Sequence, residues 1–600
     1  MFRRLYKNFA WFIHLYRRPY TVAAIFLVIN YGLSLVPPWM VGKVADGLIG
    51  GNLQPAEFIH LIILLVLTVA ALYGVNYIWN VRLLKAGDEI ARVTRQRLME
   101  RFRRQGPKFY ANNTVGSLLG KSTNDVVALS STAGYAVMSL FDAAIQPIAI
   151  ILIMGFQVSW KMTFFSLLPL PLVMVVSLYA GKRVYPLYDR AQAAFDEMNS
   201  MVLDNVSGVR VVRAYGRQQQ QIEAFATESE KLYKSNMRVV RYSIIFPVIS
   251  KLIPGLSYAI ALAMGGSLVS SGQISAGDMV SFIIYLDMMV WPMFALGDFI
   301  NVSHMGIASM ERIQELLDEP YDVSDDTTAV PYTGTTDIVF DHFSFSYPES
   351  DEFALQDISF RLPAGQTLGV VGCVGSGKST LLKQFLRYYP LTDDSIYLGG
   401  NPLRKYQISS LRSRIGYCSQ QPFLFSDSIK QNILFGNMPP VDNPVARLQE
   451  VIDLADVRKD LEQMPRGIET RTGEKGVTLS GGQRQRISIA RALFKNPDIL
   501  ILDDSLSAVD AATETHILER LRAERQGKTT LISAHRLSCV MHADWILVMD
   551  GGRIRAQGTH EMLLKKDTWY RKQYYYQLAS GGKTTAVERQ GVDFHENKRF

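Results

Sequence analysis

The residues whose types and spacing best suit a chemical function form a glycine-rich segment at positions 372–380. Its sequence is GCVGSGKST, and its glycines and polar side chains are Gly372, Gly375, Ser376, Gly377, Lys378, Ser379 and Thr380. The glycines let backbone N–H groups turn inward around a phosphate, and the dipole of a following helix attracts its negative charge. The ammonium of Lys378 can then reach the terminal phosphates, and the hydroxyl of Ser379 can hold Mg²⁺. This P-loop pattern predicts a site for a nucleoside triphosphate.

Two further segments have residue types that suit the same chemistry. The apolar run ILILDD at 499–504 ends in two carboxylates, of which Asp503 suits a Mg²⁺ ligand at the end of a strand. The segment LSGGQ at 479–483, called the signature below, opens a helical sequence and contains Ser480, Gly481, Gly482 and Gln483. A helix start of this composition again suits a phosphate. Because one nucleotide does not need two such helix starts, we expect two of these domains to pair, each closing the nucleotide site of the other.

An α/β domain must position these segments. From about residue 337, short apolar strands alternate with helical sequences and glycine turns, which is typical of such a domain. The strand QTLGVVG at 366–372 leads directly into the P-loop. We expect the domain to cover residues 337–578 and to be followed by a polar, disordered tail at 579–600.

The first half of the chain has the pattern of a membrane domain. A helix needs about 20 apolar residues to cross a bilayer, and six stretches qualify, at roughly 20–45, 57–82, 133–156, 158–183, 241–268 and 275–305. The connections 83–132 and 184–240 are long and rich in Lys and Arg, whereas the others are short and poor in them. The positive-inside rule therefore places both long connections and both termini in the cytoplasm. We expect an all-α, six-helix transmembrane domain at 19–310 and a linker at 311–336.

Smaller features agree with this organisation. Residues 1–18 predict an amphipathic interfacial helix, and the alternative of a cleaved signal peptide lacks a small-residue cleavage site. Breaks at 109–120 and 205–216 lie at the tips of the long connections, where each could dock on another domain or be a solvated helix–turn–helix. The net charge of +8 is explained by basic residues beside the apolar spans, which orient a protein in the membrane. It therefore does not indicate a nucleic-acid partner. No metal-ligand spacing is present among the cysteines, which are Cys373, Cys418 and Cys539.

The signature, placed between a P-loop and an ILILDD-type strand, resembles the ATP-binding cassette (ABC) family, and the likeness covers residues 1–578. The resemblance implies ATP and Mg²⁺ as cofactors and assigns further roles. Tyr347 would stack on adenine, and Gln420 would sense Mg²⁺ and contact the membrane domain. The SAVD segment, Ser507 to Asp510, matches the loop that joins two cassettes, and His535 matches the switch histidine near the γ-phosphate. The six spans with two cytoplasmic tips resemble the exporter branch, whose tips act as coupling helices.

The chain departs from the family at the position after Asp503, where a glutamate normally polarises the attacking water. Asp504 is shorter by one methylene, and a misplacement of ~1 Å can cost about a hundredfold in rate. Since the signature is intact and serves the opposite chain in this family, the pattern favours a heterodimer in which this chain's own ATP site is impaired. A working site with a conservative exchange, and hence a homodimer, is the alternative. Two further departures are Arg471 in place of a glutamate and Ser419 in place of a proline.

Carboxylates within membrane spans are costly and indicate function. Asp142 falls in the third span, and Asp287 and Asp298 fall in the sixth. The last two are eleven residues apart, which at about 100° per residue places them on nearly one helix face. Together with Tyr285 and Trp291, they predict a cavity for amphipathic cations. The alternative is that Asp298 is solvated at the cytoplasmic end and that Asp142 pairs with a basic neighbour.

The leading interpretation is half of an ATP-driven exporter in a bacterial inner or plasma membrane. It would move small hydrophobic or cationic drug-like molecules out of the cytoplasm together with a second ABC half-transporter. A lipid or peptide exporter, and an ATP-gated channel or regulatory subunit, are the alternatives. A soluble DNA-associated ATPase could share the P-loop and the signature, but the membrane spans exclude it.

Overall fold

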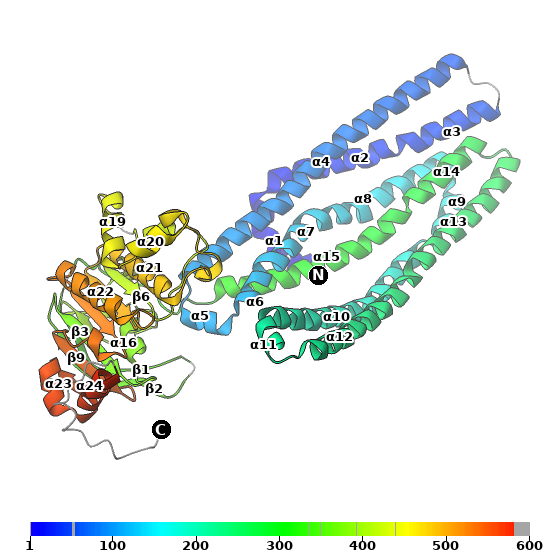
Figure 1. The fold of residues 1–600 in the computed structure, drawn as a ribbon. Coiled ribbons are helices and arrows are strands. Elements are labelled where there is room, and N and C mark those ends of the chain that lie inside the picture. Colours follow the sequence, from blue (N-terminus) through cyan, green and yellow to red (C-terminus); the bar gives the residue numbers. More distant parts are fainter. Residues whose placement is uncertain are drawn as a thin grey trace. The chain divides into compact units, whose positions relative to one another are not determined.

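The computed structural model describes residues 2–50, 54–334, 336–348, 350–391, 393–437 and 440–580. The chain divides into two compact units, each described here by itself. The helical unit is Met1–Arg103 with Thr114–Glu319, and the α/β unit is Arg104–Asn113 with Pro320–Phe600. The predicted combination of an all-α domain and an α/β domain is confirmed (Figure 1).

The helical unit is built from long helices joined by short turns and by π-helical segments at Lys121–Asp125, Thr132–Ala136 and Gly155–Ser159. Its helices are α1 (Phe2–Leu15), α2 (Arg17–Ser34), α3 (Val36–Ile49), α4 (Pro55–Arg104), α6 (Val115–Gly120), α7 (Val126–Ser131), α8 (Val137–Met154), α9 (Trp160–Leu167), α10 (Pro171–Ser207), α11 (Val209–Ala214), α12 (Gln218–Ser243), α13 (Ile245–Ser270), α14 (Ala276–Met288) and α15 (Val290–Asp318).

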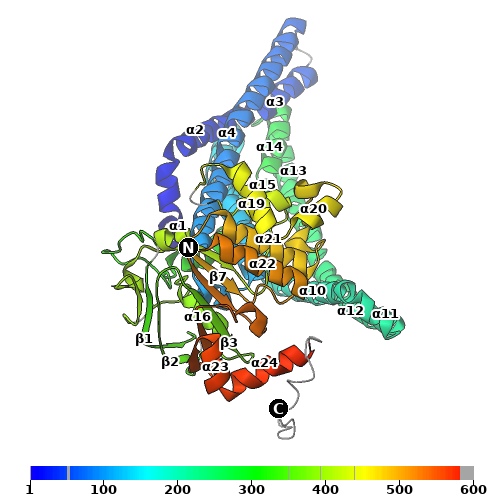
Figure 2. The same cartoon turned by 60° about the vertical axis from the view of Figure 1, so that its left-hand side comes forward.

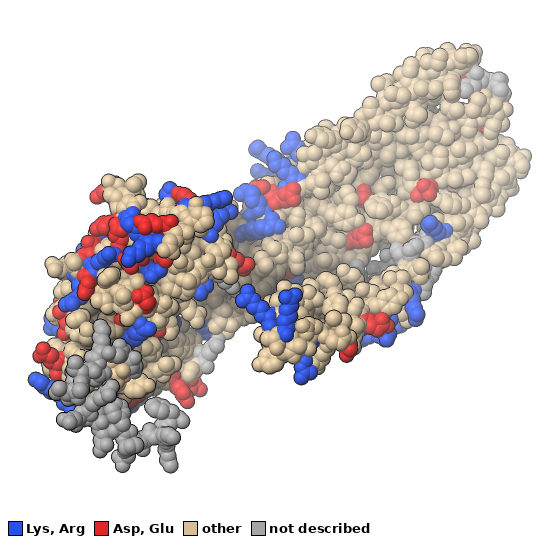
Figure 3. Space-filling view, viewed as in Figure 1, with Lys and Arg blue, Asp and Glu red and all other residues tan. Residues whose placement is uncertain are grey.

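Five helical stretches among the described residues are long and apolar enough to span a membrane: Arg17–Ile49, Pro55–Arg104, Val115–Val173, Lys251–Ser270 and Ala276–Asp318. The sequence predicted six spans, and the third and fourth of these meet within the single run Val115–Val173. At Ser159 in this run the backbone is extended, and the Ser159 hydroxyl accepts a hydrogen bond from the Met162 N–H at the start of α9. Outward-facing apolar side chains make much of this unit uncharged on the face shown in Figure 3.

Two of the apolar stretches are interrupted, at Leu35 between α2 and α3 and at Met289 between α14 and α15. Prolines follow the first interruption, and they cannot donate the backbone hydrogen bonds of a regular helix. Side chains of α14 bond two backbone carbonyls beside this interruption: the Tyr285 hydroxyl donates to Leu35 O at 2.7 Å, and the Ser281 hydroxyl donates to Pro38 O at 3.0 Å. Helix α14 therefore stabilises the irregular start of α3.

Helices α3 and α14 approach each other through two glycines. A Cβ atom added at Gly277 would lie 2.0 Å from the carbonyl oxygen of Gly42, so no larger residue fits there without movement. The Asp46 carboxylate of α3 accepts hydrogen bonds from the Ser275 hydroxyl and the Gly277 N–H, both at 2.7 Å. This contact joins the two helices at the N-terminus of α14.

The two predicted tips have different surroundings. Helix α5 (Pro107–Asn112), in the first tip, belongs to the α/β unit, where Phe109 is 1 % exposed. In the second tip, α11 connects α10 to α12, which lie side by side in Figures 1 and 2, and α11 has no buried residue. The first tip therefore has the packing of a docked helix, and the second presents an open surface.

The α/β unit contains two sheets and the helices around them. Its strands are β1 (Ile338–Ser346), β2 (Phe353–Leu362), β3 (Thr367–Gly372), β4 (Ile396–Leu398), β5 (Asn401–Pro402), β6 (Ile415–Cys418), β7 (Ile499–Asp503), β8 (Thr529–Ser533), β9 (Trp545–Asp550) and β10 (Arg553–Gly558). Its longer helices are α16 (Lys378–Gln384), α17 (Ile408–Arg414), α18 (Ile429–Leu434), α19 (Pro444–Leu454), α20 (Arg458–Gln463), α21 (Gly481–Phe494), α22 (Ala511–Glu524), α23 (His560–Lys566) and α24 (Thr568–Ser580).

The larger sheet has the strand order β10-β9-β3-β8-β7-β6, in which only β10 is antiparallel to its neighbour. Parallel strands end at one edge, so the segments that follow β3, β7 and β8 emerge together. In the register, Ser533 pairs with both Val370 and Asp503. The smaller, antiparallel sheet has the order β2-β1-β4-β5. This topology brings the P-loop, the ILILDD carboxylates and the switch histidine segment to one place.

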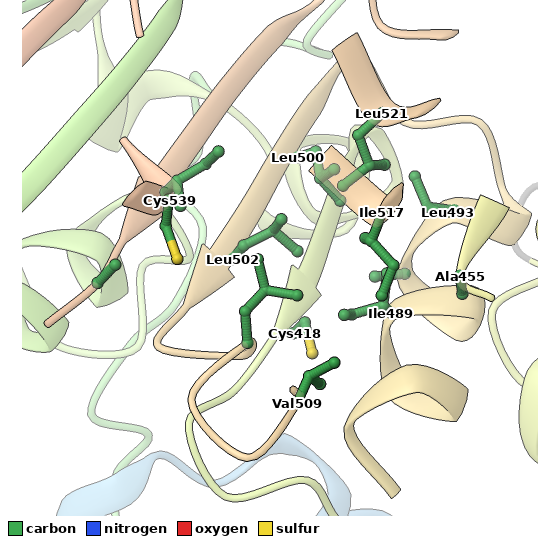
Figure 4. Close-up of a cluster of buried hydrophobic side chains, with 14 of the residues drawn as sticks. Cys418, Ala455, Ile489, Leu493, Leu500, Leu502, Val509, Ile517, Leu521 and Cys539 are labelled. Carbon is green, nitrogen blue, oxygen red and sulfur yellow. The ribbon is translucent and has the colours of Figure 1, made fainter. Parts of the chain in front are cut away.

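Apolar side chains fill two clusters. The first contains residues of both sheets, where the rings of Phe340 and Phe360 stack with centroids 4.7 Å apart. The second lies among β6, β7, α21 and α22 and includes both Cys418 and Cys539 (Figure 4). These clusters fix the strands whose ends carry the polar residues.

One boundary differs from the expected one. Helix α15 continues to Asp318, into the segment expected as a linker, because no helix-breaking residue occurs before Pro320. The N-terminal α1 buries Phe9 and Phe12, in agreement with an amphipathic helix. Most of the predicted polar tail lies outside the described residues, which end at Ser580.

The close approach of α3 and α14 gives a first prediction. Gly277→Ala should destabilise the helical unit by about 1–3 kcal/mol, because the added methyl overlaps the Gly42 carbonyl. Gly266→Ala is the matched control, since a Cβ there meets nothing within 4 Å. The midpoint of thermal unfolding of the purified protein measures both. Equal midpoints for the two variants would contradict the packing described.

Candidate functional site

The P-loop turns tightly between β3 and α16. Gly375 and Gly377 have φ values of 80° and 97°, in the left-handed region that favours glycine. A Cβ at Gly372 would lie 2.2 Å from Met549 O, so the loop also needs glycine there for space. The Ser376 hydroxyl is buried without a hydrogen-bond partner. An unused donor within a loop of inward-turned backbone fits the oxygen atoms of a phosphate.

Lys378 is held back against the loop. Its Nζ donates to the carbonyl oxygens of Gly372 at 2.9 Å and Cys373 at 2.8 Å. Burial lowers the pKa of this ammonium, and the nearby Asp504, Cys373 and Asp503 partly oppose that effect. A buried ammonium bound only by neutral carbonyls is well suited to a phosphate, which supplies the missing negative charge.

Oxygen ligands of the kind that Mg²⁺ prefers gather at the end of β7. The Asp503 carboxylate is 1 % exposed and accepts hydrogen bonds from the Ser379 hydroxyl at 2.8 Å and the Ser533 hydroxyl at 2.7 Å. The Gln420 amide donates to Asp504 Oδ2 at 3.3 Å. The residues predicted for Mg²⁺, namely Ser379, Asp503 and Gln420, therefore lie around adjacent carboxylates, and this donor set fits the ion.

The backbone fixes the position of Asp504. Its φ of 46° is in the left-handed region, and its N–H lies within hydrogen-bond distance of both Ser533 O at 3.0 Å and Ser533 Oγ at 3.1 Å. Because these contacts anchor the Cα, the reach of the carboxylate depends on side-chain length. An aspartate therefore holds its oxygens closer to the end of β7 than a glutamate would.

One cavity of about 460 Å³ collects most of the predicted residues. Its predicted lining residues are Tyr347, Gly375, Ser376, Gly377, Lys378, Ser379, Thr380, Gln420, Asp504 and His535. The Tyr347 hydroxyl lies 2.8 Å from Thr380 Oγ1, which places the ring beside the start of α16. Sequence reasoning missed Phe353, Gly551 and Gly552, which also line the cavity. They come from β2 and the β9–β10 turn, which no local motif relates to the P-loop.

The signature lies apart from this cavity, whose described lining includes none of its residues. Ser480 caps α21: its hydroxyl accepts from the Gln483 N–H, and the Gln483 side chain accepts from the Ser480 N–H. Gly481 and Gly482 form the first turn after this cap. The Asp510 carboxylate caps α22 in the same way, and the Thr513 N–H that it binds lowers its pKa.

Contacts that the sequence did not reveal hold the switch segment. Gln577 of α24 donates to His535 O at 3.0 Å and accepts from the Leu537 N–H at 2.9 Å. The Arg536 guanidinium donates to Glu514 of α22 at 2.9 Å. No sequence signal could have identified Gln577, because it lies in another helix and in no motif. The side chain of His535 itself is exposed and lines the cavity.

The two other departures from the family pattern have simple surroundings. The Ser419 hydroxyl donates to the carbonyl oxygen of Gln421, two residues on. Arg471 has an exposed side chain, and its backbone bridges to Ser428. Nothing in the structure assigns a function to either exchange.

The three carboxylates predicted in the membrane spans each accept a hydrogen bond from a tyrosine. The pairs are Tyr31–Asp142 at 2.5 Å, Tyr258–Asp287 at 2.6 Å and Tyr135–Asp298 at 2.8 Å. Asp142 also accepts from Trp291 Nε1 at 3.0 Å, so its hydrogen-bond donors among the described residues are aromatic side chains and not basic ones. Asp287 contacts α13, whereas Asp298 contacts the π-helical segment before α8. The interruption at Met289 separates the two, and the structure places them against different neighbours instead of in one shared site.

Comparisons with known proteins agree with this architecture. Residues 20–293 match the family model of the ABC transporter transmembrane region, and residues 355–507 match that of the ABC transporter. The chain is 43 % identical over 569 residues to a probable multidrug resistance ABC transporter ATP-binding/permease protein, YheI, of Bacillus subtilis, covering 95 % of this chain and 97 % of the relative. It is 38 % identical to the multidrug resistance-like ATP-binding protein MdlA of Escherichia coli, covering 98 % of each.

More distant similarities extend over the same length. An ATP-dependent lipid A-core flippase of Syntrophus aciditrophicus is 30 % identical, with 93 % of this chain and 92 % of the relative covered. A solved structure of a bacterial Atm1-family ABC exporter with ATP bound superimposes with a TM-score of 0.78 at 24 % identity, covering 97 % of this chain and 99 % of that one. This likeness shows the fold of an ABC exporter.

The chain is thus a membrane-spanning protein with an ATP-hydrolysing domain, and it belongs to the ABC transporter family. Within that family it has the exporter architecture, in which one chain carries both the transmembrane region and the nucleotide-binding domain.

The thiols give a prediction for the nucleotide site. Cys373 in the P-loop is exposed, whereas Cys418 and Cys539 are buried, and burial raises the pKa of Cys418 to about 11 and also raises that of Cys539. N-ethylmaleimide should therefore modify Cys373 first and inhibit ATP binding by occupying phosphate space, and bound ATP should slow this reaction. Mass spectrometry of the labelled protein with and without ATP measures it. Cys373→Ser is the control, and undiminished inhibition in that variant would show that another thiol is responsible.

Proposed function

We propose that this chain is one half of a heterodimeric, ATP-driven exporter of hydrophobic or cationic drug-like molecules, and that its own ATP site is hydrolytically impaired. The observation that carries the proposal is Asp504: a short carboxylate on an anchored backbone stands where the family has its general base. The intact signature, Ser480 to Gln483, would serve the active site of the partner. ATP at the impaired site would then mainly hold the two cassettes together.

The residues around the cavity have the chemistry to bind Mg-ATP. Lys378 and the P-loop N–H groups would bind the phosphates, and Tyr347 would stack on the adenine ring. Ser379, Asp503 and Gln420 would hold Mg²⁺, which neutralises phosphate charge when bound. His535 would contact the γ-phosphate. Its loop is held by a hydrogen bond from Gln577 and by the ion pair of Arg536 with Glu514. This chain therefore supplies the residues of its own half of the Mg-ATP site.

Hydrolysis makes a stricter demand than binding. The attacking water must lie in line with the γ-phosphate, and a misplacement of ~1 Å can cost about a hundredfold in rate. Asp504 cannot advance toward the water without breaking the contacts of its N–H with Ser533. The side chain also accepts a hydrogen bond from Gln420, which directs one oxygen away from other partners. These features support ATP binding with slow hydrolysis at this site.

The signature supports a role in a second subunit. Ser480 and the glycines after it open α21 but do not line the cavity of their own chain. The Gln485 side chain of α21 contacts the SAVD loop, accepting from the Ala508 N–H at 3.0 Å and lying 3.3 Å from the Ser507 hydroxyl. A partner's nucleotide that bound at the signature would therefore contact a helix joined to the loop that the family places between cassettes. A homodimer remains the alternative assembly.

The direction and the cargo follow from the membrane half. Both basic connections and the ATPase domain would lie in the cytoplasm of a bacterial cell, with α5 and α11 as the coupling helices. The names of the multidrug relatives favour export of drug-like compounds. A lipid exporter is the second candidate, favoured by the flippase relative.

Asp504 itself gives a direct test. In the purified pair, Asp504→Asn should lower steady-state ATPase activity by less than about threefold, whereas removal of the partner's catalytic glutamate should nearly abolish it. Asp504→Glu should raise hydrolysis at this chain's site, because the longer side chain restores the reach of the usual base. If Asp504→Asn stops hydrolysis as completely as loss of the partner's glutamate, the site is catalytic and a homodimer becomes the simpler account.

The signature gives an independent test. Gly481→Asp should lower the ATPase activity of the pair more than about tenfold, because it places a negative charge against the partner's γ-phosphate. A Cβ at Gly481 meets only Ala508 Cβ, at 3.6 Å, so the fold accommodates a side chain there. Gly481→Ala is therefore the matched control and should retain most of the activity. Equal losses in the two variants would indicate a steric effect on α21 and contradict the proposed role.

A further inference from the structure

The Asp142 carboxylate of α8 is held by two aromatic residues from two other helices. Tyr31 of α2 donates to its Oδ1 at 2.5 Å, and Trp291 of α15 donates to its Oδ2 at 3.0 Å. Asp142 is 8 % exposed, so water contributes little to its solvation. The carboxylate thus depends on neighbouring side chains for its stability.

Neither of these donors carries a positive charge. No Lys, Arg or His among the described residues forms an ion pair with Asp142, although such pairs occur elsewhere in this unit, for example between Arg312 and Asp125. Burying a carboxylate without a cation is costly, and hydrogen bonds from neutral groups recover only part of that cost. The site therefore lacks the charge that would complete it.

The two donors also provide the surfaces that organic cations prefer. The faces of tyrosine and tryptophan rings attract cations, and the attraction strengthens where water is excluded. Tyr31 is buried, whereas the Trp291 residue is 49 % exposed, so the tryptophan forms the accessible side of the group. A carboxylate flanked by two aromatic rings is the chemistry that recognises an ammonium or phosphonium group.

A further buried polar group lies at the same interface. The Ser139 side chain lies one turn from Asp142 on α8, is 1 % exposed and interacts with the Tyr135 hydroxyl. That hydroxyl donates to Asp298 of α15. Polar side chains therefore continue along α8 from Asp142 toward Asp298.

The donors lie where their helices are least regular. Tyr31 is one turn before the interruption at Leu35, and Trp291 is two residues after the interruption at Met289. Helices bend most readily where their internal hydrogen bonds are interrupted. Both donors therefore lie within one turn of a break in their helices.

We propose that Asp142, Tyr31 and Trp291 form a binding site for the cationic group of an organic cation that the transporter carries. The carboxylate supplies the charge, Trp291 supplies the accessible aromatic face, and Tyr31 exchanges its hydrogen bond as the cation arrives. This inference rests on the proposed export function but not on the proposed asymmetry of the ATP sites. It also separates Asp142 and Asp298, which lie along α8 and α15, from Asp287, which contacts α13.

The test compares tetraphenylphosphonium with triphenylphosphine oxide, a neutral compound with similar rings. Binding is measured by equilibrium dialysis with the complete transporter in nanodiscs of zwitterionic lipid at pH 8. Asp142→Asn should weaken phosphonium binding at least about tenfold and change binding of the neutral compound less than about twofold. Asp88→Asn, which removes an exposed acid of α4, is the matched control and should change neither.

Two further variants separate recognition from a structural role. Trp291→Phe keeps an aromatic face and should retain most of the cation affinity, whereas Trp291→Leu should lose it. Tyr31→Phe removes the hydroxyl that competes for the carboxylate and should tighten phosphonium binding. These variants report on the site even if Asp142→Asn does not fold.

The outcomes decide the inference. No phosphonium binding by the wild-type protein, equal losses of the cation and the neutral compound in Asp142→Asn, or equal affinity in Trp291→Phe and Trp291→Leu would each overturn it. A selective loss in Asp287→Asn with none in Asp142→Asn would place the cation against α13 and also overturn it. None of these results would alter the ATPase measurements on Asp504 and Gly481, so failure here is distinct from failure of the asymmetric ATP sites.

Discussion

The hydrogen bonds that converge on Asp503 are the interaction on which the ATP site depends. The hydroxyls of Ser379 and Ser533 both bind one oxygen of this buried carboxylate; Ser379 follows β3, and Ser533 is the last residue of β8. The parallel register of β3, β8 and β7 makes this possible, since it brings their carboxyl ends level. Asp504, Lys378 and His535 follow from the same three ends, so the site is a consequence of sheet topology.

In the helical unit, polar groups within the membrane must find hydrogen-bond partners in the protein, because water does not reach them. At the interruption before α3, hydroxyls of α14 bond two backbone carbonyls, and at the start of α14 the Asp46 carboxylate binds the backbone and Ser275. The tyrosine partners of Asp142, Asp287 and Asp298 follow the same rule. Irregular backbone and acidic residues therefore occur where another helix supplies a donor or an acceptor.

The sequence predicted local chemistry well, because the P-loop, the signature and the ILILDD strand are each contiguous segments whose residue types have a direct physical meaning. The sequence could not predict the residues that complete the site. Strand order brings Gly551 and Gly552 near the P-loop, and helix packing brings Gln577 to the switch segment; no spacing in the chain indicates either contact. In the membrane half, helical periodicity placed Asp287 and Asp298 on one face, but the interruption at Met289 and the positions of Tyr258 and Tyr135 decided their neighbours. Periodicity describes one helix, and contacts depend on several.

The hydrogen bonds between α24 and the switch segment affect the order in which the site forms during synthesis of the protein. Gln577 bonds both His535 and Leu537, so the loop around the switch histidine acquires its native support only after α24 has been synthesised. The P-loop and Asp503 emerge from the ribosome well before that helix. During translation the switch segment therefore lacks these two hydrogen bonds until α24 has been made, after the strands β1 to β10.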